Sequence, residues 1–382
     1  MRLVATSEQV ALQEMLRRLL EKNCPTSLVR ELKAAGHESL PNGLWTALRD
    51  AGVLGMAVDE RYGGGSASLY ELGLVFGQAG RALCPTLVYS TLTFGVALDR
   101  LGTDEQKLRY LPALARGDLR ASTALWNPSD AGDVRPSVTA RRVDGGWSLT
   151  GSLPYLQNAE QADVVLLSAF TAPDGGSSEP PRTIAVLVVP GGPCWRAEPR
   201  IGIAGAPVSS VALDDYRVLD DAVIDPGASG LDATALRWVA QAATALQCME
   251  MAGGTAAVID QTVAYVKTRE QFGRPIASFQ AVQHHVANMR IALDAARLSA
   301  TQATWRISRG ELATRAVAIA AMQCSEAYRW TTLTCHQLQG GMGYIRDTDL
   351  HLWSERAKVT ELLGGNADVA AGWLQRELGL IG

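Results

Sequence analysis

Residues 268–276 read TREQFGRPI. This stretch separates two long, Ala-rich segments, 236–268 and 279–309, whose apolar residues recur at helical spacing. Within it, the permanently charged, planar guanidinium of Arg269 comes shortly before the aromatic ring of Phe272. Each residue alone could have an ordinary role, because an arginine at a helix end is commonly solvated and a phenylalanine commonly packs in a core. Their spacing within one short connection makes the stretch informative.

Helical spacing extends over the C-terminal part of the chain. A third long segment of this kind covers residues 313–339, and only Gly253 and Gly254 interrupt the first segment. Helices of this length usually pack against one another. We therefore expect residues 231–382 to form a C-terminal four-helix bundle.

The pattern is different before residue 231. Residues 118–230 contain short runs rich in Val, Leu and Ile, separated by turn residues at 144–146, 174–176 and 190–192, which predicts a β domain of hairpins. Residues 1–117 show helical spacing again. The sequence thus predicts an α+β protein with an N-terminal helical domain, a middle β barrel or sandwich, and the C-terminal bundle.

Composition excludes several classes of protein. The 382 residues include 35 Lys and Arg against 39 Asp and Glu, a net charge of -4, so no basic surface for nucleic acid is indicated. The chain has no signal-peptide pattern and no apolar run of about 18 residues that could span a bilayer, so we expect a cytoplasmic protein. The cysteines lack the spacing of a zinc site or a disulfide framework and are expected to be reduced: Cys24, Cys84, Cys194, Cys248, Cys324 and Cys335.

Two motifs carry a family resemblance. Residues 269–276, with Phe279 and Gln280 after them, resemble the Arg-x-x-Phe-Gly-x-Pro-Ile signature of the acyl-CoA dehydrogenases. Residues 337–344, QLQGGMGY, are similar to that family's Gln-x-x-Gly-Gly-x-Gly-Tyr. The resemblance implies a flavoprotein that removes a proton from Cα and a hydride from Cβ of an acyl-CoA, with electron-transfer flavoprotein as acceptor. It also implies dimers of dimers in which each FAD lies across a subunit boundary.

The resemblance further implies which residues contact FAD. Arg269 would reach the pyrophosphate of the neighbouring subunit's FAD, and the ring of Phe272 would lie against its adenine. Gly340 and Gly341 could instead form an ordinary helix C-cap, but the joint occurrence of all these residues at family spacing favours an adenosine-binding face. The residues expected there are Arg269, Gln271, Phe272, Ile276, Phe279, Gln280, Gln337, Gly340 and Gly341.

The catalytic base of the family is missing. Most members carry a Glu at the head of a Glu-Gly-Thr turn, and the matching position in this chain is Gly364. Other members place the base in the helix before the signature arginine, where this chain has Ala243. Neither residue can accept a proton.

The middle domain also departs from the family. Residues 126–133, WNPSDAGD, stand for Thr-Glu-Pro-Gly-x-Gly-Ser-Asp and keep Asp133 but lose the hydroxyl groups that meet flavin and CoA. Residues 155–158 stand for Trp-x-Thr-Asn and place Gln157 where threonine would approach the flavin. The larger side chains of Trp126 and Gln157 could fill part of the ring or acyl site.

The family residues that this chain keeps and those that it lacks serve different parts of the flavin site. In this family the neighbouring subunit holds the adenosine half of FAD, whereas the base and the ring pocket come largely from the same chain as the flavin. The sequence keeps the residues expected to bind the adenosine half and lacks the base and the usual residues of the ring pocket. Our leading hypothesis is therefore a base-lacking subunit of an α2β2 acyl-CoA dehydrogenase that completes the flavin site of a homologous partner. By analogy with heteromers of this kind, the acyl group would be bulky, such as a steroid side chain.

Two alternatives stay open. The chain could form a homomeric enzyme with an unusual base, drawn from Glu250, Glu361 or Asp368, of which Glu250 is favoured because it lies in an apolar helix where burial raises a carboxyl pKa. It could also be a non-catalytic scaffold that binds no flavin. The retained Arg269 and Phe272 argue against the scaffold.

Overall fold

The computed structural model describes residues 5–36, 41–172, 181–200, 202–224 and 230–380. These residues form two compact units, each assembled from separate stretches of the chain. The bundle unit comprises the described residues of Met1–Val29, Leu69–Cys84 and Thr244–Gly382, and the sheet unit those of Arg30–Ser68 and Pro85–Ala243. The predicted boundaries at 117/118 and 230/231 follow the order of helices and strands along the chain and stay a prediction.

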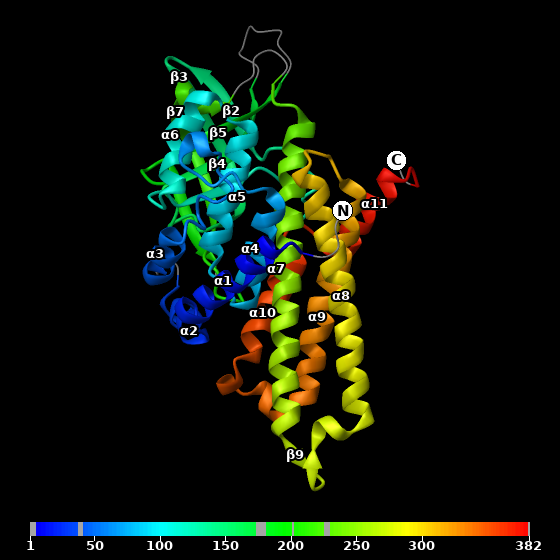
Figure 1. The fold of residues 1–382 in the computed structure, drawn as a ribbon. Coiled ribbons are helices and arrows are strands. Elements are labelled where there is room, and N and C mark those ends of the chain that lie inside the picture. Colours follow the sequence, from blue (N-terminus) through cyan, green and yellow to red (C-terminus); the bar gives the residue numbers. More distant parts are fainter. Residues whose placement is uncertain (1–4, 37–40, 173–180, 201, 225–229, 381–382) are drawn as a thin grey trace. The chain divides into compact units, whose positions relative to one another are not determined.

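The bundle unit is built on three long helices that run side by side (Figure 1). The predicted helical segments 236–268, 279–309 and 313–339 match α7, α8 and α9 to within a few residues. The unit's helices are α1 (Ser7–Asn23), α4 (Leu69–Arg81), α7 (Ala233–Thr268, which begins in the sheet unit), α8 (Gln280–Ser308), α9 (Thr314–Gln339), α10 (Leu350–Leu362) and α11 (Ala367–Glu377). α2 (Thr26–Ala35) spans the residues at which the two units divide.

The glycine pair in α7 has a packing role and does not interrupt the helix. A Cβ on Gly253 would lie 1.8 Å from the backbone oxygen of Gly77 in α4, so the two helices touch backbone to backbone. A Cβ on Gly254 would lie 2.4 Å from the ring of Tyr328 in α9. Any larger residue at either position would force the helices apart.

In the sheet unit, the described residues form one sheet in the order β6-β7-β3-β2-β4-β5-β8, with β1 beside β4. β4 runs parallel to β1 and β2, and the other neighbours are antiparallel. The strands are β1 (Ala121–Ala124), β2 (Val138–Val143), β3 (Gly146–Gln157), β4 (Val164–Thr171), β5 (Thr183–Val188), β6 (Trp195–Arg200), β7 (Val208–Leu219) and β8 (Val223–Ile224).

The hairpin prediction holds only in part. The turn residues at 144–146 do connect the paired strands β2 and β3. Those at 190–192 connect β5 to β6, which are not neighbours in the sheet, so no hairpin forms there. The predicted turn at 174–176 lies outside the described residues.

The sheet is buried on both faces along β4. Val164 and Leu166 join a core cluster with the helical residues Phe94 and Leu98, whereas the alternate residues of β4 face a second cluster around Trp147. This alternation explains why β4 reads as an unbroken apolar run. The remaining helices of the sheet unit are α3 (Asn42–Asp50), α5 (Thr86–Leu101) and α6 (Asp104–Ala115). No helix among the described residues is both long and apolar enough to cross a membrane.

Candidate cofactor-binding face

The signature stretch forms a tight hairpin between α7 and α8. β9 (Glu270–Gln271) pairs antiparallel with β10 (Arg274–Pro275), and the turn residues Phe272 and Gly273 both have positive φ, 57° and 78°. Two-residue turns of this kind normally carry Asn or Gly at the first position, because a bulky residue with positive φ is strained. A phenylalanine at the tip therefore requires a reason outside the turn.

The ring of Phe272 is turned out of the protein. It is 91% exposed and makes one ring contact, edge-on to Phe279 with centroids 6.0 Å apart. The guanidinium of Arg274 lies over the other aromatic ring, 4.3 Å from the centroid of Phe279. Phe279 therefore contacts both Phe272 and Arg274 of the hairpin, while one face of the Phe272 ring stays open for stacking.

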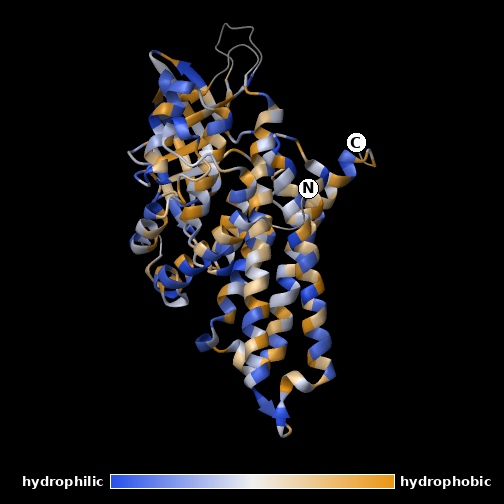
Figure 2. Ribbon diagram, viewed as in Figure 1, coloured by the Kyte–Doolittle hydropathy of each residue, from blue (hydrophilic) through white to orange (hydrophobic). Residues whose placement is uncertain are grey.

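Arg269 follows the last residue of α7 and is fixed by its backbone alone. Its amide donates to the Tyr265 oxygen at 2.9 Å, and its carbonyl accepts from the Ile276 amide at 2.8 Å. Its guanidinium is exposed and forms no ion pair with any residue that the structure describes. Figure 2 shows hydrophilic residues, drawn blue, gathered at this hairpin. Arg269 is thus held in place with its charge available to an external anion.

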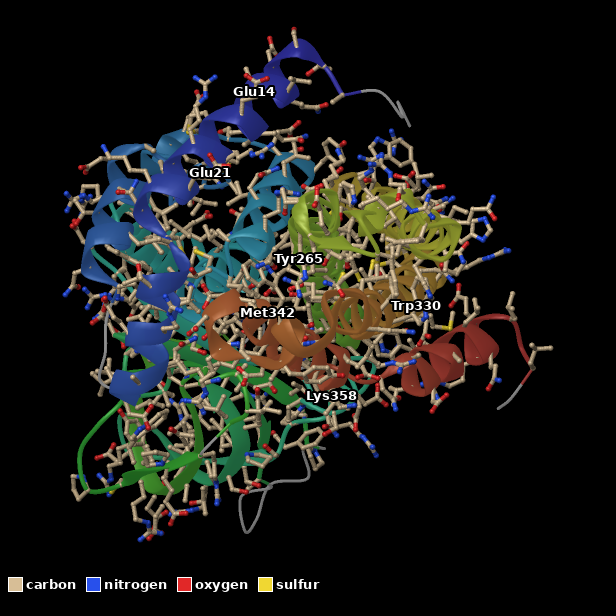
Figure 3. All side chains as sticks on the ribbon, turned by 90° about the horizontal axis from the view of Figure 1, so that it is seen from below. Glu14, Glu21, Tyr265, Trp330, Met342 and Lys358 are labelled. Carbon is tan, nitrogen blue, oxygen red and sulfur yellow. The ribbon has the colours of Figure 1, made fainter. Side chains whose placement is uncertain are left out.

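The second motif lies at the same end of the bundle. Buried Gln339, the last residue of α9, donates from Nε2 to the Thr262 hydroxyl at 2.9 Å, and the Tyr265 hydroxyl donates to the backbone oxygen of Gln339 at 3.4 Å. Tyr265 of α7 and Met342 of the turn after α9 are both labelled in the view from below (Figure 3). These bonds tie the end of α9 to the last turns of α7, so the structure brings together two motifs that are distant in sequence.

The turn after α9 offers bare backbone. The 3-10 helix η5 (Gly340–Tyr344) begins at Gly340, which has φ 60° and ψ -138°, a conformation open essentially to glycine alone. A Cβ added at Gly340 or Gly341 would meet nothing within 4 Å. The open space beside these glycines, together with an available guanidinium and an open aromatic face, fits the adenosine diphosphate half of a dinucleotide.

All nine predicted cofactor residues lie in the bundle unit. Seven are exposed, and Ile276 and Phe279 are half-buried supports for the hairpin. The exposed set consists of Arg269, Gln271, Phe272, Gln280, Gln337, Gly340 and Gly341. Thr262 and Tyr265, which join the two motifs, could not be found from local sequence pattern, and Gln339 stands at a position that the second motif leaves unspecified.

Neither base position carries an ionisable group. Gly364 follows α10 with φ 79°, and Gln247 of α7 holds this turn by donating to the Thr360 and Leu363 oxygens at 2.8 and 3.3 Å. An L-residue at 364 would be strained, so one substitution could not simply restore a glutamate. Ala243 lies within α7.

Glu250 is buried in an ion pair. Its Oε1 lies 3.7 Å from Nη1 of Arg356, whose Nη2 donates to the Cys84 oxygen at 2.7 Å. Among the other weaker candidates, Glu361 pairs with Lys358 at 2.9 Å, and Asp368 is exposed in the first turn of α11. The arrangement around Glu250 is that of a charge neutralised inside the fold.

The altered segments of the sheet unit have partners within that unit. Trp126 packs against the core cluster that contains Phe94 and Leu98, so its side chain has a packing role within the sheet unit. Asn158 is buried with φ 55°; its Nδ2 donates to Ser90 and its Oδ1 accepts from Thr86, at 2.9 and 3.0 Å. Bidentate hydrogen bonds from Arg135 lower the pKa of Asp133 to about 2.

Comparison with known proteins identifies the family. The model of the acyl-CoA dehydrogenase N-terminal domain matches residues 6–118, and that of the C-terminal domain matches residues 234–379. The chain belongs to the acyl-CoA dehydrogenase family. The resemblance read from the two motifs and the predicted fold are thereby confirmed. The family is one of oxidoreductases acting on CH–CH bonds, and FAD is its cofactor, as predicted.

Three relatives span nearly the whole chain. An acyl-CoA dehydrogenase of Bacillus subtilis (strain 168) is 29% identical and covers 95% of this chain and 96% of its own. A solved variant of the Tcur3481–Tcur3483 steroid ACAD is 25% identical, with a TM-score of 0.84 and 98% of each chain covered. The ChsE4–ChsE5 complex from Mycobacterium tuberculosis is 27% identical, with a TM-score of 0.87 over 100% of each chain.

Proposed function

We propose that this chain is the base-lacking subunit of a heteromeric acyl-CoA dehydrogenase, an α2β2 assembly in which it completes the FAD site of a homologous partner. The observation that carries the proposal is the contrast at the site. The exposed motif residues of the bundle end are retained, whereas the two base positions are Gly364 and Ala243. Such a chain can bind a cofactor half but cannot remove a proton from a substrate carbon.

The retained residues have distinct roles in this proposal. The guanidinium of Arg269 would bind the pyrophosphate of FAD through paired N–H donors, and Phe272 would stack on the adenine through its open face. Gly340 and Gly341 would let the nucleotide approach the backbone closely. When bound, FAD supplies the acceptor for the hydride that leaves Cβ.

The partner would supply the carboxylate that takes the Cα proton. Glu250, the strongest alternative in this chain, weighs against a homomeric enzyme because Arg356 neutralises it inside the bundle unit. A general base needs to reach its substrate and to gain a proton at working pH, and a buried ion pair opposes both.

We further propose a bulky acyl-CoA, such as a steroid side-chain thioester, as substrate, and electron-transfer flavoprotein as acceptor. The support is the similarity to a steroid ACAD built from two different chains, and to a second two-component complex, over nearly all of this chain. An assembly in which only half the chains carry a base leaves more room for each acyl group.

The test is a single substitution in the co-expressed complex. Arg269→Ala in this chain should weaken FAD binding about 10- to 100-fold, because a charge-assisted hydrogen bond is lost at a group that has no structural role. Flavin absorbance per heterodimer, with native mass, measures it. The matched control is Arg315→Ala, an exposed arginine near the start of α9 and so at the other end of that helix. Full flavin content in the Arg269 variant would overturn the proposal.

A further inference from the structure

His336, in the last turns of α9, has both ring nitrogens engaged. It is 7% exposed, with Nδ1 2.7 Å from the Gly343 oxygen and Nε2 2.6 Å from the Ser354 hydroxyl of α10. The ring of Tyr344 lies against the imidazole, tilted by 31° with centroids 5.0 Å apart. One side chain thus links α9, η5 and α10.

The partners fix where the proton sits on the imidazole. A carbonyl oxygen only accepts, so Nδ1 carries the proton and donates to Gly343. In the neutral imidazole Nε2 then accepts the hydroxyl hydrogen of Ser354 at 2.6 Å, a shorter contact than the 3.4 Å from that hydroxyl to the Leu350 oxygen. Burial, with a smaller effect of nearby His351, lowers the pKa of His336 despite its hydrogen bond to Gly343. A neutral imidazole, with one donor and one acceptor nitrogen, therefore suits the carbonyl at Nδ1 and the hydroxyl at Nε2.

This contact controls the turn that begins with the two open glycines. Gly343 packs directly on His336, since a Cβ there would lie 3.0 Å from the His336 backbone oxygen. Gly340 and Gly341 are exposed at the start of the same turn, and a Cβ added to either glycine would have no atom within 4 Å. The bond from Nδ1 to Gly343 is therefore an anchor that fixes the path of this bare backbone.

We propose that His336 is a positioning residue for the adenosine half of the dinucleotide, acting through its Nδ1–H bond to Gly343 on the backbone of Gly340 and Gly341. The inference rests on the proposed function, because it assumes that these glycines face the FAD of the partner. It assigns a role to a residue outside both sequence motifs and to one specific donor atom.

The two amide substitutions separate this role from simple packing. His336→Asn places an amide N–H near the position of Nδ1 and should keep the bond to Gly343, whereas His336→Gln places its amide near Nε2 and should lose it. In the deflavinated co-expressed complex, we expect FAD to bind about tenfold more weakly to the Gln variant and within about threefold of the parent in the Asn variant. The affinity for ADP should also fall more in the Gln variant than in the Asn variant, because the affected contact is to the adenosine half.

Two further results complete the test. Equal melting temperatures of the ligand-free Asn and Gln complexes, with unequal FAD affinity, support positioning. Equal FAD affinity in both variants and the parent overturns the role of His336. If Arg269→Ala in the same complex still strips the flavin, the proposed function survives that result. If Arg269→Ala also leaves FAD binding unchanged, the nucleotide face itself is wrong and both proposals fail.

Discussion

The hairpin end of the bundle unit and the altered loops of the sheet unit use their polar and aromatic side chains in opposite ways. At the hairpin, Arg269 and Phe272 are exposed, although Phe272 occupies a strained conformation. In the sheet unit, Asn158 and Asp133 also match family motif positions, but each has hydrogen-bond partners within its own unit. The hydrogen bonds of Asn158 thus give it a role in folding, whereas the exposure and positive φ of Phe272 are what the proposed contact with FAD predicts.

The buried ion pair gives the largest effect on folding. Glu250→Gln should lower the free energy of unfolding by about 3 kcal/mol, because Arg356 is left with an uncompensated buried charge. Urea denaturation of the chain measures it, with the exposed Glu326→Gln as control. Dehydrogenation per flavin in the folded complex should be unchanged, and its abolition would identify Glu250 as a base.

Asn158 should behave as a structural residue. Asn158→Ala removes two buried hydrogen bonds and places alanine at φ 55°, so we expect a loss of about 2–3 kcal/mol in unfolding free energy. The FAD affinity of complexes that still assemble should stay close to that of the parent. Exposed Asn288→Ala in α8 serves as the control, and a selective loss of FAD with unchanged stability would place Asn158 on the functional side of the comparison.

Phe272 should separate stability from binding. Phe272→Gly should raise the unfolding free energy by up to about 1 kcal/mol, since glycine relieves the positive φ and a 91% exposed ring has little burial to lose. FAD affinity should fall about 5- to 10-fold through loss of stacking. Phe272→Tyr keeps the ring and should retain affinity. A Gly variant that loses stability would show that the ring has a folding role.

The smallest effect is a pH dependence in the sheet unit. Arg135 holds the pKa of Asp133 at about 2, below its ordinary value of 3.8, so this contribution is present above about pH 4 and is lost as pH falls toward 2. Arg135→Gln should therefore lower the urea midpoint slightly at pH 5, and the difference from the parent should be smaller at pH 2.5, where part of the Asp133 carboxyl is protonated in the folded chain. An equal difference at both pH values would contradict the assignment.

The sequence predicts local structure better than it predicts partners. The predicted segments match α7, α8 and α9 to within a few residues because long runs with one apolar period permit few alternatives. The hairpin interpretation failed at 190–192, since a turn signal does not say which strands lie side by side. Likewise, no local pattern links Glu250 to Arg356 or His336 to Ser354, because these pairs are formed only by helix packing.

At the candidate site, too, the sequence predicts the motif residues but not the contacts that each of them makes. Motif spacing predicts the nine cofactor residues as one set, and the structure brings the hairpin and the end of α9 together through Thr262, Tyr265 and Gln339. What spacing could not indicate is which retained residues have partners inside the chain. That distinction depends on exposure and hydrogen bonding, which follow from the folded structure alone.

The most direct measurement is the flavin content of this chain purified alone and co-expressed with a homologous acyl-CoA dehydrogenase chain that carries the base, each with its native mass. The complementing role predicts little or no flavin absorbance in the chain alone and one flavin per heterodimer in an α2β2 complex. A yellow homotetramer with one flavin per chain would contradict it and return the search for a base to Glu250.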